Sequence, residues 1–318
     1  MRKALGVELQ FAIGVAGLLT GNIVRGVRTR HRGTRRRMAA YTLFERPDGG
    51  VVEVDHRRPP DAEFGVLLFN GLGLPHEQWS WVRGFLPGNA ACVGYNRPGH
   101  GLSSPLRGAT LEDQFRIVDE LRERYLDDLP LVLVGHSIGG YLAAAYAASR
   151  GSAASRESGA LSHVVMVDPT IISDLQASFG LLPDWWTRQR LLMECLWAAT
   201  GLNILRPMTP AGTLYSEEIK ESLTAYHARP RVWATAYREY MTARTYPPVG
   251  RLGLPLHVVT ALKGTRSAEK HRRSQETMLE LSDSSWHHVL DDADHMGVVA
   301  EQTHAKTLAE LVIPGRVA

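Results

Sequence analysis

Short apolar runs recur along the chain and alternate with longer segments of helical periodicity. Runs of strand type lie at 41–46, 51–56, 64–71, 91–101, 131–137, 163–169, 254–260 and 286–290. Apolar side chains three and four positions apart, the periodicity of a helix, occupy 110–126, 138–149, 269–282 and 297–312. Apolar strands separated by helices are typical of a mainly parallel sheet covered on both faces. The pattern therefore predicts the α/β class.

Residues 171–250 interrupt this alternation. They are rich in Trp, Tyr, Arg and Met and have helical patterns around 184–199, 216–227 and 231–243. An ordinary series of packing helices is one interpretation. Because the segment lies between two predicted strands and carries many aromatic side chains, we favour a helical cap over a substrate pocket. Residues 41–318 then form one domain, with the cap inserted at about 171–250.

The N-terminal segment has a different pattern. Residues 4–24 are mostly apolar, and seven arginines follow within 25–37. A helix of 21 residues rises about 31 Å, close to the hydrocarbon thickness of a bilayer. A cleaved signal peptide would carry its basic residues first, and a helix lying on the membrane surface would carry more charges. Residues 1–40 therefore predict a membrane-spanning helix and a basic linker, with the catalytic domain on the cytoplasmic side.

Charge and cysteine content narrow the function classes. Residues 1–37 carry nine basic residues and one acidic residue, a net charge of +8, which leaves −5 of the total of +3 for the rest of the chain. The body therefore offers no basic face for nucleic acid. Cys92 and Cys195 lie in apolar contexts and indicate neither a disulfide framework nor a zinc site. No metal-ligand cluster or dinucleotide fingerprint stands out, so we expect neither a metal nor a cofactor.

The apolar run at 131–137 ends in Gly-His-Ser-Ile-Gly and leads directly into an alanine-rich helical segment. This G-x-S-x-G pattern indicates a nucleophile elbow, because a sharp strand-to-helix turn tolerates only small residues two positions either side of the serine. Ser137 would project from the carboxyl end of the sheet, where a helix N-terminus favours developing negative charge. The bare motif occurs by chance in about one chain in ten of this size. Its place between a strand and a helix favours a nucleophile over an inert structural serine.

With this elbow, residues 41–318 resemble the α/β-hydrolase family, in its serine hydrolase branch. FNGLG at 69–73 is similar to the family's oxyanion loop, with Asn70 in place of the usual His. GYNRPGHGLSSP at 94–105 is similar to the family's D-x-R-G-x-G-x-S segment, with Asn96 in place of the Asp. The resemblance implies a triad of serine, acid and histidine and an acyl-transfer reaction.

Acyl transfer needs N–H donors for the negatively charged oxygen of the tetrahedral intermediate. The resemblance implies that the backbone N–H groups of Leu72 and Ile138 form this oxyanion hole. It also implies that Arg97 and His100, in the segment 94–105, belong to the scaffold rather than to the catalytic group.

The base and the acid are assigned from the resemblance. His295 lies in LDDADHMGVVAE, between the last strand and the last helix, where the family has its catalytic histidine. The family's usual acid follows the penultimate strand, but HVVTALKGTRSAEK has no acid before Glu269. Asp168 ends the strand at 163–169, a position that some family members use, and it preserves the order Ser137, acid, His295. We predict Asp168 as the acid; the alternatives are Glu269, Asp291, Asp292 and Asp294.

These residues favour a serine hydrolase that cleaves a small-molecule ester, thioester or amide through an acyl-enzyme intermediate. An aromatic cap and a membrane anchor favour an apolar acyl group. Two alternatives use the same residues: an acyltransferase or a cofactor-free haloperoxidase. A third, supported by the missing acid after the penultimate strand, is a catalytically silent binding protein. Fold alone does not choose among them.

Overall fold

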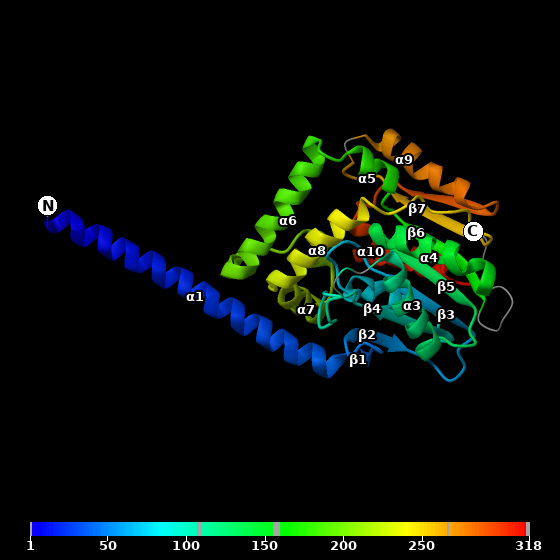
Figure 1. Ribbon diagram of the computed structural model, residues 1–318, viewed down its shortest axis with the longest axis horizontal. Coiled ribbons are helices and arrows are strands. Elements are labelled where there is room, and N and C mark those ends of the chain that lie inside the picture. The colour runs from blue at the N-terminus through cyan, green and yellow to red at the C-terminus, as the bar shows by residue number, and fades with distance from the viewer. Residues whose placement is uncertain (1, 107, 109, 155–159, 266, 316–318) are drawn as a thin grey trace.

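The computed structural model describes residues 2–106, 108, 110–154, 160–265 and 267–315 (Figure 1). Eight strands form one sheet in the order β1-β2-β4-β3-β5-β6-β7-β8. β2 runs antiparallel to β1 and β4, and the remaining neighbours are parallel. The strands are β1 (Thr42–Glu45), β2 (Val51–Arg57), β3 (Phe64–Phe69), β4 (Ala90–Tyr95), β5 (Leu131–His136), β6 (Leu161–Val167), β7 (Leu256–Ala261) and β8 (Ser285–Leu290).

Helices cover both faces of the sheet. α3 (Leu111–Tyr125) and α4 (Ile138–Ala154) pack on one face, and their apolar side chains form the larger core with the strands. α2 (Ser80–Phe85) and α11 (Gln302–Leu311) form the second core on the other face. Every residue of β3, β4, β5 and β7 is buried, as expected for central parallel strands that are covered on two sides. The predicted mainly parallel sheet with two helical layers is confirmed.

The chain between β6 and β7 is helical, as the sequence predicts. In Figure 1 its longer helices stand together beside the sheet. The helices are α5 (Ile172–Ala177), α6 (Leu182–Thr200), α7 (Glu217–His227) and α8 (Pro230–Ala243), with 3₁₀ turns at Leu202–Leu205 and Ala211–Leu214. After β7 come α9 (Ala268–Glu276) and a 3₁₀ turn at Thr277–Leu281, and α10 (Gly297–Ala300) follows β8. A 3₁₀ turn at His76–Trp79 precedes α2.

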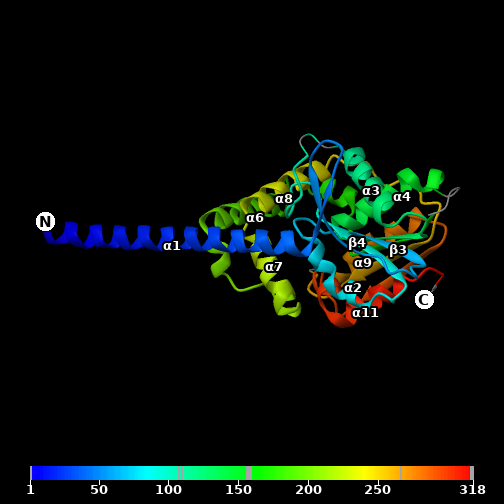
Figure 2. The ribbon, with the colours of Figure 1, turned by 90° about the horizontal axis from the view of Figure 1, so that it is seen from below.

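The N-terminal segment is one helix, α1 (Arg2–Ala40). Its first half extends away from the rest of the chain, and its second half runs beside α6 and α7 (Figures 1 and 2). Glycines permit the close approach: a Cβ on Gly33 would lie 2.3 Å from the Cβ of Ala225, and one on Gly26 would lie 3.1 Å from the Cα of Gly201. The predicted basic linker at 25–40 is therefore wrong, because this part of the chain is a packed helix.

The predicted membrane-spanning helix at 4–24 is also corrected. In the part of the chain that the structure describes, no helix is both long enough and apolar enough to cross a bilayer. The described side chains of α1 begin at Thr20, so residues 4–19 of the predicted span lie outside them. From there on α1 carries the arginines of 25–37, and charged side chains are costly in hydrocarbon. The finding overturns the predicted membrane anchor and the cytoplasmic-side membrane localisation drawn from it.

Candidate active site

Ser137 lies on a strained turn between β5 and α4. Its φ of 57° falls in the left-handed region, which a non-glycine residue adopts only at a cost of about 1–3 kcal/mol. A Cβ on Gly135 would lie 2.1 Å from the carbonyl oxygen of Gly139, and one on Gly139 would lie 2.2 Å from that of Phe69. Both glycines of the motif are therefore required by close backbone contacts, as expected for a nucleophile elbow.

Asp168 follows β6 and is 4% exposed. Its Oδ2 accepts a hydrogen bond from Nδ1 of His295 at 2.5 Å, and its Oδ1 accepts one from the backbone N–H of Ala261 at 3.2 Å. Burial alone would raise the pKa of Asp168, but hydrogen bonds from His271 and His295 hold that pKa well below its usual range. Asp168 is therefore a carboxylate that fixes one ring nitrogen of His295 and leaves Nε2 for chemistry.

The other acids weighed from the sequence lie elsewhere. Glu269 is exposed and pairs with Arg272 and Arg273 on its own helix, α9. Asp294 accepts backbone N–H groups of Met296 and Gly297 within its own loop. Asp291 and Asp292 are exposed. Of the predicted candidates, the structure brings only Asp168 into hydrogen-bond contact with His295.

His136, the residue before Ser137, contacts His295. Its Nε2 donates to the carbonyl oxygen of His295 at 2.7 Å, and the two rings lie 4.6 Å apart. Complete burial lowers the pKa of His136 to about 3, so that the ring stays neutral. In the sequence, His136 is only the variable residue of the elbow. Its contact with His295 was not predictable, because His295 lies in a loop 159 residues further along the chain.

Thr170 is a second neighbour that sequence reasoning missed. Its Oγ1 lies 3.4 Å from Oγ of Ser137, and its backbone N–H donates to the carbonyl oxygen of Ser137 at 3.0 Å. Among the hydrogen bonds of the described residues, none joins Ser137 Oγ to His295. Catalytic hydrogen bonds are often loose without substrate and tighten only in the complex.

The loop after β3 is held by buried hydrogen bonds. Asn70 donates through Nδ2 to the carbonyl oxygen of Tyr95 at 2.7 Å and accepts from Nε1 of Trp79 at 3.1 Å. Asn70 thus provides a donor and an acceptor where the family usually has His. Ile138 begins α4, and the N–H of a first helical residue has no acceptor within its helix. These features suit an oxyanion hole built from the N–H groups of Leu72 and Ile138.

Comparison with known proteins agrees with this geometry. Residues 66–311 match the model of the Alpha/beta hydrolase family. The chain belongs to this family. No curated protein matches the sequence.

Several solved structures share the fold of this alpha/beta hydrolase. A candidate alpha/beta hydrolase from Nostoc sp PCC 7120 has 13% identity and a TM-score of 0.67, over 86% of this chain and 97% of that one. A structure of epoxide hydrolases from metagenomes of hot environments has 18% identity and a TM-score of 0.60, over 87% and 99%. A thermophilic esterase from Thermogutta terrifontis has 19% identity and a TM-score of 0.58, over 84% and 94%. At these identities the similarity establishes the fold alone.

Arg97 joins the loop after β3 to α8. It donates to the carbonyl oxygens of Asn70 at 2.5 Å and Gly71 at 3.0 Å, and its Nε lies 2.5 Å from Oε1 of Glu239. His100 bonds Tyr226 Oη at 2.9 Å. Arg97 and His100 therefore both make contacts that hold neighbouring segments together, as expected for scaffold residues.

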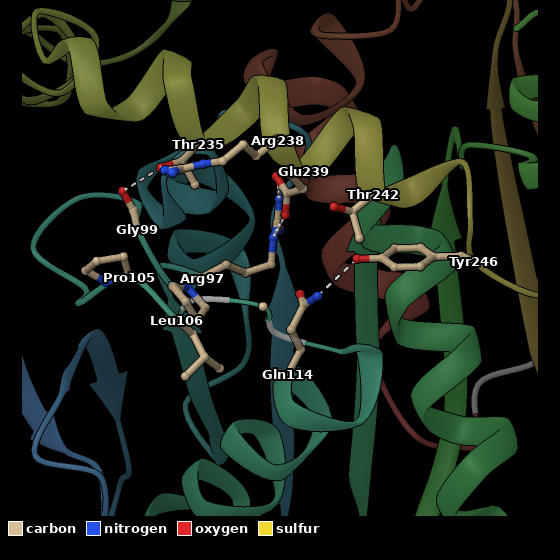
Figure 3. A pocket seen from close by; sticks show the side chains of 12 residues that line it. Arg97, Gly99, Pro105, Leu106, Gln114, Thr235, Arg238, Glu239, Thr242 and Tyr246 are labelled. Atoms are coloured by element: carbon tan, nitrogen blue, oxygen red, sulfur yellow. Dashed lines mark hydrogen bonds and ion pairs between the residues drawn. The ribbon is translucent and has the colours of Figure 1, made fainter.

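A cavity of about 440 Å³ is lined by Arg97 together with residues of α3 and α8. Figure 3 shows α8 above it, with Glu239 directed toward Arg97 and Gln114 bonded to the hydroxyl of Tyr246. Neither Ser137 nor His295 lines it. The lining of this cavity therefore does not include the side chains of the candidate active site.

One group of three potential metal ligands occurs among the described residues: Glu53, His76 and Glu77. Arg37 already supplies the cation there. Its Nε lies 2.8 Å from Oε1 of Glu53, and its guanidinium forms a two-point ion pair with Glu77. The two carboxylates are therefore compensated by a side chain, and the donors do not fit an additional metal ion.

Proposed function

We propose that this alpha/beta hydrolase is a serine hydrolase that cleaves an ester, thioester or amide through an acyl-enzyme intermediate. The observation that carries the proposal is the placement of Ser137 on a strained elbow. It is supported by a histidine whose Nδ1 is fixed 2.5 Å from a buried carboxylate. These are the parts that nucleophilic acyl transfer requires.

In the proposed reaction, Nε2 of His295 takes the proton from Ser137 as Oγ attacks the carbonyl carbon. The N–H groups of Leu72 and Ile138 stabilise the resulting oxyanion, and Asp168 stabilises the imidazolium. His295 then returns the proton to the leaving group, which departs as the acyl-enzyme forms. Water, activated by His295, attacks the acyl carbon and releases the acid and the free Ser137 hydroxyl.

The identity of the nucleophile favours acyl substrates over epoxides, although a structure of epoxide hydrolases shares the fold. Attack of Ser137 on an epoxide carbon would form an ether, which has no carbonyl for water to attack. Attack on an acyl carbon forms an ester, which water cleaves by the same route in reverse. Ser137 therefore suits turnover on an ester or related acyl compound.

Apolar side chains next to the proposed oxyanion hole favour an apolar acyl group. Leu72 and Leu175 pack with α6 and α8, together with Leu191, Tyr237 and Met241. In this proposal residues 41–318 form the hydrolase domain, and the helical segment at about 171–250 serves as the cap that supplies this surface. The relative rates on acyl chains of increasing length test this part.

Labelling with a fluorophosphonate probe tests the nucleophile. The folded wild-type protein should be labelled, and Ser137→Ala should not. Ser149→Ala is the matched control, because Ser149 lies on α4 and bonds only the carbonyl oxygen of Tyr146. Labelling that survives in Ser137→Ala would identify another nucleophile. A folded wild-type protein that never reacts would support the silent binding protein instead, and a panel of esters with alcohol or water as acceptor would separate hydrolase from acyltransferase.

A further inference from the structure

Asp168 contacts two histidines rather than one. His295 Nδ1 lies 2.5 Å from its Oδ2, and His271 Nε2 lies 2.8 Å from its Oδ1. His271 comes from α9, the helix after the strand where the family usually has its acid. A buried carboxylate therefore lies between two imidazoles, of which only His295 was expected from the sequence.

The second histidine restrains the carboxylate. Asp168 has a φ of 39°, so its backbone is strained. Its carboxylate is held by three hydrogen bonds. Oδ1 accepts from His271 and from the N–H of Ala261 at 3.2 Å, which leaves Oδ2 directed at His295. Loss of His271 would leave the weaker backbone bond alone on Oδ1.

The groups around His271 favour its protonated form. The hydrogen bond and the charge of Asp168, and the charge of Asp174 from α5, raise the pKa of His271 above its ordinary value, against a smaller effect of burial. Its neighbours on α9 are the exposed Lys270 and the Arg272–Glu269 ion pair. The His271 side chain is 29% exposed, so that it can exchange protons with solvent.

Protonation of His271 changes what Asp168 can do for the reaction. Neutral His271 donates one hydrogen bond and leaves the full negative charge to stabilise the imidazolium of His295. Protonated His271 forms an ion pair with the same carboxylate and places a like charge near that imidazolium, which disfavours the transition state. We propose that His271 is a positioning residue that holds Asp168 for catalysis and, by gaining a proton, weakens the support that Asp168 gives to His295. This inference rests on the proposed triad.

The pH dependence of kcat/KM on a soluble ester tests the inference. Because protonation of His271 adds its own loss of activity, the acid limb of the wild type should be steeper than about one decade per pH unit, whereas His271→Gln should fall with a slope of about one. Glutamine keeps a neutral N–H donor at the place of Nε2 and removes the titration. At alkaline pH this variant should stay within about twofold of the wild type, while His271→Ala, which also loses the donor, should lose about 3–10-fold in kcat.

Lys270→Gln is the matched control, because it removes a neighbouring positive charge on α9 without touching Asp168. Its acid limb should follow the wild type. Superimposable acid limbs of His271→Gln and the wild type would overturn the proposal, as would equal losses in His271→Gln and His271→Ala at alkaline pH.

A second measurement separates this proposal from the proposed function. The imidazole nitrogen signals of His271 and His295, followed by NMR against pH, should titrate in a coupled manner in the wild type. In His271→Gln, the His295 signal should follow a single titration. If Ser137 never reacts with the probe but the two rings are coupled, the serine hydrolase fails and the interaction stands. Independent titrations in the wild type would refute the role of His271.

Discussion

Two clusters in this protein each pair buried carboxylates with histidine, but they differ in how far their side chains are exposed to solvent. The closed centre consists of Arg37, Glu53, His76 and Glu77, whose side chains are all at most 1% exposed. The open centre consists of Asp168, His271 and His295, whose histidine side chains are 29% and 50% exposed. Both pair acids with histidine, and the open centre lacks an arginine.

The difference is the one expected between a stabilising site and the active site proposed above. In the closed centre a permanent cation compensates both acids. Burial opposes ionisation, but His76 and Arg37 hold the pKa of Glu53 at about 2, so that Glu53 stays a carboxylate near neutral pH. In the open centre the side chains that pair with the carboxylate are two imidazoles that reach solvent. An acid with a perturbed pKa is therefore a stronger sign of chemistry when its partners reach solvent than when a buried arginine compensates it.

The largest expected effect is on the open centre. Asp168→Asn should lower turnover by about 10⁴-fold, because an amide favours the wrong tautomer of His295 and cannot stabilise its cation. Steady-state kinetics on a soluble ester measure this loss, and circular dichroism checks the fold. Glu269→Gln is the control and should be nearly neutral, since Glu269 is exposed and pairs only within α9. Near-normal turnover in Asp168→Asn together with loss in Glu269→Gln would reverse the assignment.

The closed centre should respond in stability and not in chemistry. Arg37→Met should lower the free energy of unfolding by about 3–5 kcal/mol, because it leaves two buried carboxylates without their cation. The midpoint of urea unfolding measures this change. Arg36→Met is the matched control, because Arg36 pairs with Glu218 and Glu221 at the surface and should contribute less than about 1 kcal/mol. Equal midpoints for the two variants would contradict the division between the centres.

Lowering the pH should reduce the stabilisation from the closed centre over a range of pH values. Burial opposes ionisation of Glu53, but His76 and Arg37 lower its pKa from 4.5 to about 2. The unfolded chain takes up a proton at a higher pH than the folded chain does, so the stabilisation is complete above about 4.5 and is lost as pH falls through about 2. Urea midpoints of the wild type should therefore decline over this window, and those of Arg37→Met should decline less. Parallel declines would show that other carboxylates dominate acid unfolding.

Local patterns predicted the strand-to-helix elbow at Ser137 well because the elbow is a local structure. The glycines at 135 and 139 are required by contacts within one turn and with the adjacent strand, and the sequence shows them directly. The mainly parallel sheet follows equally from apolar strands separated by helices. His295 could be located by its place between the last strand and the last helix.

Contacts between distant segments were not predictable in this way. His271 lies 103 residues from Asp168 along the chain, and their hydrogen bond depends on how α9 packs beside β7. Arg37 was placed in a basic linker because arginines surround it, yet its acidic partners come from 16 and 40 residues away and enclose it. The membrane prediction was wrong for another reason: it relied on the length and mostly apolar character of residues 4–24, and no described helix is both long enough and apolar enough to cross a bilayer.

The smallest expected effect concerns single hydroxyl groups, one in the closed centre and one beside the open centre. Ser222 donates to Glu77 and accepts from Arg37, so Ser222→Ala should cost about 1–3 kcal/mol in stability. Thr170 lies 3.4 Å from Ser137 Oγ, and Thr170→Val should change kcat/KM by less than about tenfold, since the long contact contributes little and His295 replaces it when substrate binds. Urea unfolding and ester kinetics on both variants measure the pair. If Thr170→Val abolished probe labelling while its stability stayed normal, the threonine hydroxyl would belong to the reacting group, and the open centre would extend beyond Asp168 and its two histidines.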